Sequence, residues 1–275
     1  GSLFDGEGWL KAMGFIDFAG STVVHSIGGW VALAGIIVLG PRLGRFGRNG
    51  QVHYLAGHNL PLVALGGFVL WLAWFGFNAA STVKADVSIG RIALNTHLAA
   101  CASAVAYMVY TLIRGKAILM RGTINASLGG LVAITAGCAT MSPLYAIISG
   151  AVAGVLVSIL PVVMEKLRLD DVVDAVTVHG FCGAWGTLAA GLFFENQMFN
   201  AGVIAVQGLG ILTAFAWGFG VALIVFKVLD VVLGGLRVSK QHEQRGLDYT
   251  EHAELSYPEF QRDVTFETDD MTKRH

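Results

Sequence analysis

Charged side chains are scarce in this sequence: Asp, Glu, Lys and Arg together make up 13% of its 275 residues. A typical soluble domain carries about 25%, so the composition argues against an ordinary water-soluble protein. Hydrophobic residues account for 55% of the chain, and the mean hydropathy is +0.64. The 36 glycines suit transmembrane helices, which pack closely through small residues. The composition therefore indicates an all-α integral membrane protein in a lipid bilayer.

Cysteine is also rare, and the chain begins without the features of a signal peptide. Cys101, Cys138 and Cys182 lie in separate apolar runs without paired spacing. This pattern predicts small buried side chains rather than a disulfide or a metal site. The first residues, GSLFDGEGWLKAMG, lack the basic start and long apolar core of a secretory signal. We therefore expect no cleaved leader in this stretch.

Long apolar runs predict seven membrane spans, since a helix needs about 20 apolar residues to cross a bilayer. The fourth run is short and rich in glycine, so its ends are the least well defined. The predicted spans are Ile16–Gly40, Leu60–Thr82, Ile92–Ile113, Ile124–Thr140, Leu144–Met164, Val172–Phe194 and Val203–Gly234.

Lys and Arg are distributed unequally between the two sides of these spans. One side has only Lys11, Lys84 and Arg91. The first, third and fifth connections have more: Arg42, Arg45, Arg48, Arg114, Lys116, Arg121, Lys166 and Arg168. Because cytoplasmic loops carry the excess of basic residues, these connections are predicted to face the cytoplasm. The tail after Gly235 is then cytoplasmic too.

Two of the predicted spans carry a histidine within related sequences. His25 follows Thr-Val-Val and His179 follows Val-Thr-Val, with Gly29 and Gly183 four residues after each ring. The first and sixth spans run in opposite directions, so the repeat is typical of an inverted structural repeat with its site near mid-membrane. An ionisable group inside a span is costly and indicates function. Two unrelated histidines, each bonded to a neighbouring carbonyl, are the alternative.

Four motifs resemble the ammonium transporter (Amt/Mep/Rh) family, in its Amt branch. They are DFAGSTVVH (Asp17–His25), WFGFNAAS (Trp74–Ser81), DAVTVHGFCG (Asp174–Gly183) and RVSKQHEQRGLDYTEHAE (Arg237–Glu254). The resemblance implies a homotrimer in the cell membrane, built from inverted five-helix repeats plus a final helix. Residues 1–234 match that transmembrane domain from its fifth helix onward, and residues 235–275 match its cytoplasmic tail. We therefore expect a piece of a longer protein.

The resemblance also implies the site. His25 and His179 match a twin-histidine pair that shares a hydrogen bond in the pore. Asp17 matches a structural carboxylate that holds backbone near the outer site. Asp174 is interpreted as a structural carboxylate that caps the start of its helix.

The outer recruitment site is expected to comprise Trp74, Phe77 and Ser81. The serine hydroxyl would accept a hydrogen bond from ammonium, and aromatic faces would hold the cation. Phe4 stands where the family usually has a tryptophan, and phenylalanine has a weaker cation–π face and no N–H donor.

The implied activity is transport of ammonium or ammonia, not enzymatic catalysis, with no cofactor, metal or nucleic-acid partner. A PII-type signalling protein is an implied partner at the cytoplasmic face. Two alternatives remain: a non-transporting ammonium sensor on the same scaffold, and a membrane cytochrome with His25 and His179 as axial haem ligands.

Overall fold

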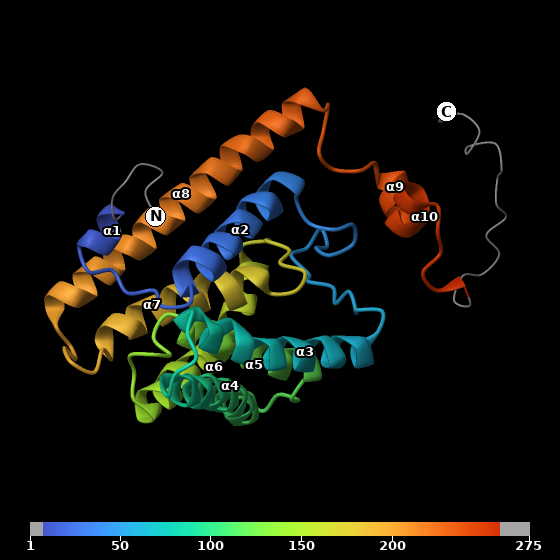
Figure 1. The fold of residues 1–275 in the computed structure, drawn as a ribbon. Helices are drawn as coiled ribbons and strands as arrows, with labels where there is room; N and C mark the ends of the chain where they lie inside the picture. Colours follow the sequence, from blue (N-terminus) through green and yellow to red (C-terminus); the bar gives the residue numbers. More distant parts are fainter. Residues whose placement is uncertain (1–7, 259–275) are drawn as a thin grey trace. The chain divides into compact units, whose positions relative to one another are not determined.

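The computed structural model describes residues 8–258, and the chain divides into two compact units, Gly1–Leu236 and Arg237–His275. Regular structure in the described residues is helical, apart from an isolated β-bridge between Phe46 and Val52. The first unit contains α1 (Trp9–Ala12), η1 (Ser21–Ser26), α2 (Ile27–Leu39), α3 (Leu60–Ala79), η2 (Ala80–Thr82), α4 (Ser88–Ile113), α5 (Met120–Ile134), α6 (Pro143–Lys166), η3 (Val176–Phe181), α7 (Cys182–Leu192) and α8 (Ala201–Val232) (Figure 1). The predicted helical class is confirmed.

Side-chain caps define where the long helices begin. Asn59 accepts a hydrogen bond from the backbone N–H of Leu62 at 3.0 Å and so starts α3. Asn200 does the same for α8, accepting from Gly202 and Val203 at 2.9 and 3.3 Å. Pro143 occupies the first turn of α6, where its missing N–H costs nothing. Two asparagines and a proline therefore fix the first turns of α3, α8 and α6.

Among the described residues, five helices are long and apolar enough to cross a membrane, against the seven spans predicted. The exceptions are α5, with 15 residues, and η3 with α7, which have 6 and 11. α5 stops early because the Ser21 hydroxyl takes the place of the next helical hydrogen bond: it accepts from the N–H of Ala136 and donates to the carbonyl of Val132, both at 2.7 Å. The carbonyls of Thr135 and Ala136 then accept from Ala19 and Phe18, at 3.1 and 3.0 Å, and turns follow as far as Thr140.

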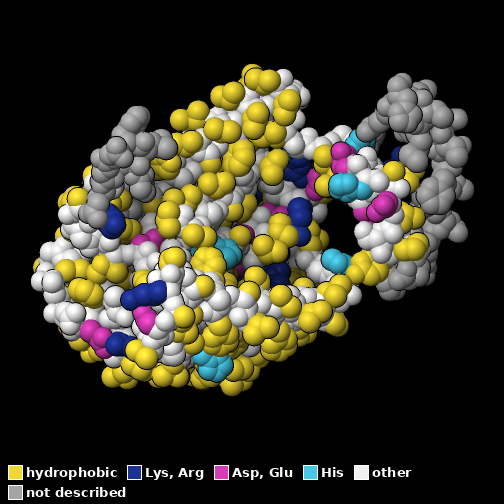
Figure 2. Space-filling model, viewed as in Figure 1, with side chains coloured by type: hydrophobic (Ala, Val, Ile, Leu, Met, Phe, Trp, Pro, Cys, Tyr) yellow, Lys and Arg dark blue, Asp and Glu magenta, His cyan; other side chains and the backbone are white. Residues whose placement is uncertain are grey.

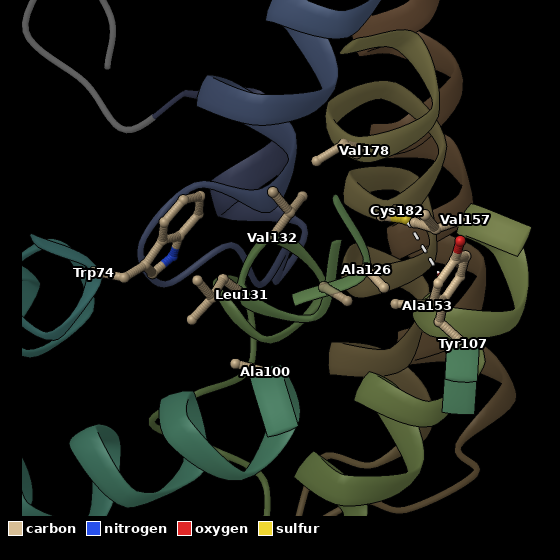
Figure 3. Close-up of a cluster of buried hydrophobic side chains, with 11 residues drawn as sticks. Trp74, Ala100, Tyr107, Ala126, Leu131, Val132, Ala153, Val157, Val178 and Cys182 are labelled. Atoms are coloured by element: carbon tan, nitrogen blue, oxygen red, sulfur yellow. Dashed lines mark hydrogen bonds between the residues drawn. The ribbon is translucent and has the colours of Figure 1, made fainter. Parts of the chain in front are cut away.

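Three helices, α4, α5 and α6, pack on one another through glycine (Figure 1). A Cβ at Gly130 of α5 or Gly150 of α6 would strike the backbone of Ala99 in α4. Small residues at such contacts are typical of membrane helices. Around them lies a buried cluster, with Trp74 at one end (Figure 3): Trp74, Ala100, Tyr107, Ala126, Leu131, Val132, Ala133, Ala153, Val157, Val178 and Cys182.

Hydrophobic side chains are exposed over much of the face of the first unit that Figure 2 shows, and many large apolar residues are exposed in this unit. On α8, which packs along α2, the side chains of Leu212, Trp217 and Ile224 are each about two-thirds exposed. On α3, Phe68 and Leu72 are exposed to a similar degree. Such surfaces suit contact with lipid or with other apolar protein.

The second unit holds two short helices, α9 (Lys240–Arg245) and α10 (Leu247–His252). Ser239 caps α9 by accepting from the N–H of His242 at 3.2 Å. Arg237 pairs with Glu243 at 2.7 Å, and the Arg245 guanidinium lies 4.6 Å from the centre of the Tyr249 ring. The predicted tail is therefore an ordered polar segment over its described residues.

Candidate functional site

The two repeated histidines lie on short π-helical segments. η1 carries His25 and η3 carries His179, and each runs directly into an α-helix. The two Nδ1 atoms are 3.3 Å apart, and the rings stack at an interplanar angle of 20° with centroids 5.3 Å apart. For one imidazole to donate and the other to accept, the accepting ring must be neutral. π-helical segments are rare in proteins as a whole, and those that occur are often found at functional sites.

The helices that carry the rings cross at glycine. A Cβ at Gly29 would overlap the backbone of Gly180, which follows His179. A Cβ at Gly183 would press on the carbonyl oxygen of Ser21 and the hydroxyl of Ser26. Ser26 also donates from Oγ to the Gly180 carbonyl at 3.2 Å. The repeated glycines therefore bring the backbones together and set the distance between the rings.

Aspartates hold the starts of both segments. Asp17 accepts hydrogen bonds from the backbone N–H of Val23 at 2.9 Å and of Thr22 at 3.2 Å. Before the second segment, the side chain of Asp171 accepts from Ala175 and Val176, both at 2.8 Å. Each carboxylate satisfies donors that the first turn of a helix leaves unpaired.

The predicted capping role of Asp174 is wrong. Asp174 has a left-handed backbone, with φ at 59°, and its carboxylate points to other partners. It accepts from Asn125 Nδ2 at 2.7 Å and pairs with Arg121 at 3.1 Å. Asp174 therefore ties its loop to α5, while the cap that the sequence assigned to it is supplied by Asp171.

Two aromatic rings of α3 lie against His25. The Trp74 ring stacks on the imidazole with centroids 5.0 Å apart, and the Phe77 ring lies at 5.5 Å. Trp74 is fixed because its indole Nε1 donates to Thr135 Oγ1 at 3.0 Å, and Thr135 donates in turn to the Leu131 carbonyl at 2.7 Å. Thr135 was not identified from the sequence.

Ser81 and Phe77 lie at the end of the same helix. The Ser81 hydroxyl, in η2, donates to the Phe77 carbonyl at 2.8 Å, one turn back. Both side chains are partly open, and the Phe77 ring is 39% exposed. Phe4, the other aromatic assigned to the outer site, lies outside the described residues.

Arginines of the first connection form ion pairs in addition to their predicted part in orientation. Arg42 binds the Asp170 carboxylate through Nε at 2.7 Å and Nη2 at 2.9 Å, and Arg45 pairs with Glu165 at 2.7 Å. Burial alone would raise the pKa of Asp170. The hydrogen bonds from Arg42 and the charges of both arginines outweigh it and hold that pKa below its usual value.

These features define a class: a helical membrane protein with two stacked imidazoles inside its helix bundle, placed by crossing π-helical segments. The chain belongs to the Ammonium Transporter Family, whose model matches residues 2–257.

Relatives and solved structures agree with this assignment. The chain is 41% identical to ammonium transporter Amt2 of Archaeoglobus fulgidus over 93% of its length, and 34% identical to ammonium transporter 1 member 1 of Arabidopsis thaliana over 92%. A solved structure described as a sensor Amt protein superposes with a TM-score of 0.86 at 41% identity, covering 91% of this chain. Candida albicans Mep2 gives 0.77 at 25% identity over 90% of this chain.

The chain spans only part of each relative. It covers 60% of the Archaeoglobus protein, 56% of the Arabidopsis protein, 64% of the sensor structure and 58% of the Mep2 structure.

Proposed function

We propose that this chain forms the pore-bearing part of an ammonium transporter, which recruits ammonium, removes its proton and conducts ammonia. The observation that carries the proposal is the contact of 3.3 Å between the ring nitrogens of His25 and His179. A bare cation cannot enter a narrow apolar passage without losing its hydration. Neutral ammonia can, and a pair of imidazoles offers it a donor and an acceptor.

Loss of the proton follows from the same physics. Removing ammonium from water disfavours its charged form, as burial does for any amine. Each imidazole has two ring nitrogens, so a hydrogen-bonded pair can take up the released proton at one ring and pass a proton on from the other. Ammonia and a relayed proton then cross the membrane as separate species.

The outer site would hold ammonium before this step. The Ser81 hydroxyl donates its own hydrogen to the Phe77 carbonyl, so its oxygen presents lone pairs to a cation. The ring of Phe77 supplies a cation–π face worth about 0.5–2 kcal/mol. Trp74 joins this site to the pair, since its ring stacks on His25.

The setting of this activity is part of the proposal. We place the protein in the cell membrane as a homotrimer, with the basic connections and the tail in the cytoplasm. A PII-type protein would bind at that face. The exposed apolar residues of the first unit support a place in the membrane, and the basic residues Arg42, Arg45 and Arg48 support this orientation.

Currents across reconstituted membranes test the central claim, using the intact polypeptide that contains this chain. His25→Asp should admit potassium, because a fixed carboxylate beside the passage stabilises an intact cation. Changing His25 and His179 together to alanine should abolish the ammonium current by removing the proton route. Unchanged ammonium current and unchanged potassium exclusion in both variants would assign the histidines a structural role.

An ammonium sensor is the second candidate, favoured by the similarity to the sensor Amt structure. It predicts that ammonium binds at the outer site while the wild-type protein conducts none. The haem alternative fits the geometry poorly. Ring nitrogens in direct contact leave no space for a porphyrin between the two imidazoles.

A further inference from the structure

The segment that leads into η1 is not helical, although it lies within the first unit. Residues 15–20 follow the short α1 and are without regular structure, with Ile16 and Asp17 partly buried and Gly20 fully buried. Backbone groups away from water must find partners, and here they cannot find them in a helix of their own. What holds this segment therefore also fixes where the His25 segment begins.

Gln207 of α8 supplies those partners. Its side chain is fully buried, and its Oε1 accepts from the N–H of Ile16 at 2.8 Å. Its Nε2 donates to the carbonyl of Ile16 at 2.7 Å and to the carbonyl of Thr187, in α7, at 2.8 Å. The Gln207 amide thus bonds to both backbone groups of Ile16, as a residue of a neighbouring β-strand would, and its third hydrogen bond reaches α7.

These bonds belong to a closed ring of contacts. Ile16 precedes Asp17, whose carboxylate accepts from the N–H of Thr22 in η1. The hydroxyls of Thr22 and Thr187 are hydrogen-bonded to each other, and the Thr187 carbonyl returns to Gln207. The ring joins the segment that carries His25 to α7, which continues from the segment that carries His179.

We propose that Gln207 is a positioning residue for the His25–His179 pair. It touches neither imidazole and acts through Ile16, Asp17 and Thr187. A buried polar network with every bond made is rigid, and the loss of one member leaves the rest unpaired. Glutamine suits the position because its side-chain amide can donate two hydrogen bonds and also accept one. Leucine has a similar volume but can neither donate nor accept.

The inference rests on the proposed function, so its test has one readout that needs transport and one that does not. The variants are Gln207→Leu and the milder Gln207→Glu, which keeps an acceptor and, when protonated, one donor. Thr213→Val is the matched control: Thr213 is partly exposed on the same helix and donates only within it, to the Leu209 carbonyl.

The first readout is amide hydrogen exchange of the purified intact protein. We expect residues 16–26 to exchange at least tenfold faster in Gln207→Leu, with an intermediate effect in Gln207→Glu and none in Thr213→Val. Exchange in α4 should stay unchanged, which separates local release from general unfolding. Wild-type exchange of residues 16–26 in Gln207→Leu would overturn the proposal, whatever the protein transports.

The second readout is ammonium transport in liposomes, expressed per mole of folded protein. A displaced histidine pair should lower the maximal rate at least tenfold and shift its pH profile, while the ammonium KM, set by the outer site, changes little. A merely structural glutamine would reduce the yield of folded protein and leave the rate per molecule and the pH profile unchanged. If the wild type itself conducts no ammonium, the proposed function fails, and hydrogen exchange alone decides the positioning role.

Discussion

Asp17 lies eight residues before His25 in the sequence, and Asp171 lies eight residues before His179. Each carboxylate accepts hydrogen bonds from the backbone of the π-helical segment that carries the histidine. Asp17 accepts from Thr22 and Val23, and Asp171 from Ala175 and Val176. The two halves of the site are therefore built alike from the aspartate to the glycine crossing. The correspondence with Asp17 predicts that Asp171, and not Asp174, caps the segment that carries His179.

Replacing Asp171 with alanine should release the start of η3. The lost cap costs about 0.5–2 kcal/mol of stability. Amide exchange at Ala175 and Val176 should accelerate, as read by mass spectrometry of the peptide that contains them. Asp174→Ala is the control, since Asp174 binds Arg121 and Asn125 instead. Equal acceleration in both variants would contradict the assignment of the cap to Asp171.

Gly29→Ala should be strongly destabilising, while Gly28→Ala should not. A methyl group at Gly29 would overlap the backbone of Gly180, and overpacking of this kind costs about 1–3 kcal/mol. At Gly28 nothing lies within 4 Å of the new methyl, and alanine favours a helix by up to about 1 kcal/mol. Thermal unfolding in detergent compares the two variants. Similar melting temperatures would show that the crossing can relax.

Acid should remove the stabilising effect of Asp170. Its pKa is lower in the folded than in the unfolded state, so its contribution is complete above the unfolded value of about 4 and is lost as the pH falls through the folded pKa. Asp170→Asn should lower the free energy of unfolding at pH 7 by about 1–3 kcal/mol, because Arg42 and Arg45 lose their partner. Below about pH 4 the difference from wild type should shrink. Glu195→Gln, in the exposed pair with Arg91, is the control and should show little effect at either pH.

Ser81→Leu and Phe77→Ala should weaken ammonium uptake without reducing the amount of folded, assembled protein. Both side chains are partly open at the end of α3, and neither forms part of the buried cluster around Trp74. Uptake of ammonium and methylammonium by cells that express the intact polypeptide measures the effect. If Phe77→Ala left both unchanged, Phe77 would not belong to the outer site.

Cysteine labelling tests the predicted orientation. In a Cys101→Ala background, Arg48→Cys should be protected from a membrane-impermeant thiol reagent in whole cells, and Val87→Cys should react. Both positions are exposed, and the remaining native cysteines are buried. The reverse pattern would place the basic connections outside the cell and Ser81 at the inner mouth.

Much of this architecture could be predicted from patterns that repeat or persist along the chain. The apolar runs predicted the long helices, and the related sequences around His25 and His179 predicted that the two rings would meet. Asp171 could have been found in the same way, because its spacing of eight residues matches that of Asp17. The sequence points to Asp174 instead, because that residue begins the recognisable motif, but its carboxylate binds Asn125 and Arg121.

Other parts of the site depend on contacts that leave no trace in local sequence. Gln207 and Thr135 are isolated polar residues in apolar runs, and their partners lie 191 and 61 positions away in the chain. The shortening of α5 likewise arises from a distant segment, because the Ser21 hydroxyl intervenes between the N–H of Ala136 and the carbonyl of Val132. Periodicity describes one element at a time, so it cannot anticipate bonds between distant segments.

The glycine crossing also limits how the two halves of the site can diverge. What a side chain at Gly29 would strike is the main chain of Gly180, and a side chain at Gly183 would strike the main-chain carbonyl of Ser21. A neighbouring side chain can be exchanged for a smaller one, but a peptide backbone cannot, so a larger residue at either glycine has to push the two segments apart. The separation of the two imidazoles is therefore set by the absence of side chains at Gly29 and Gly183 as much as by the rings themselves.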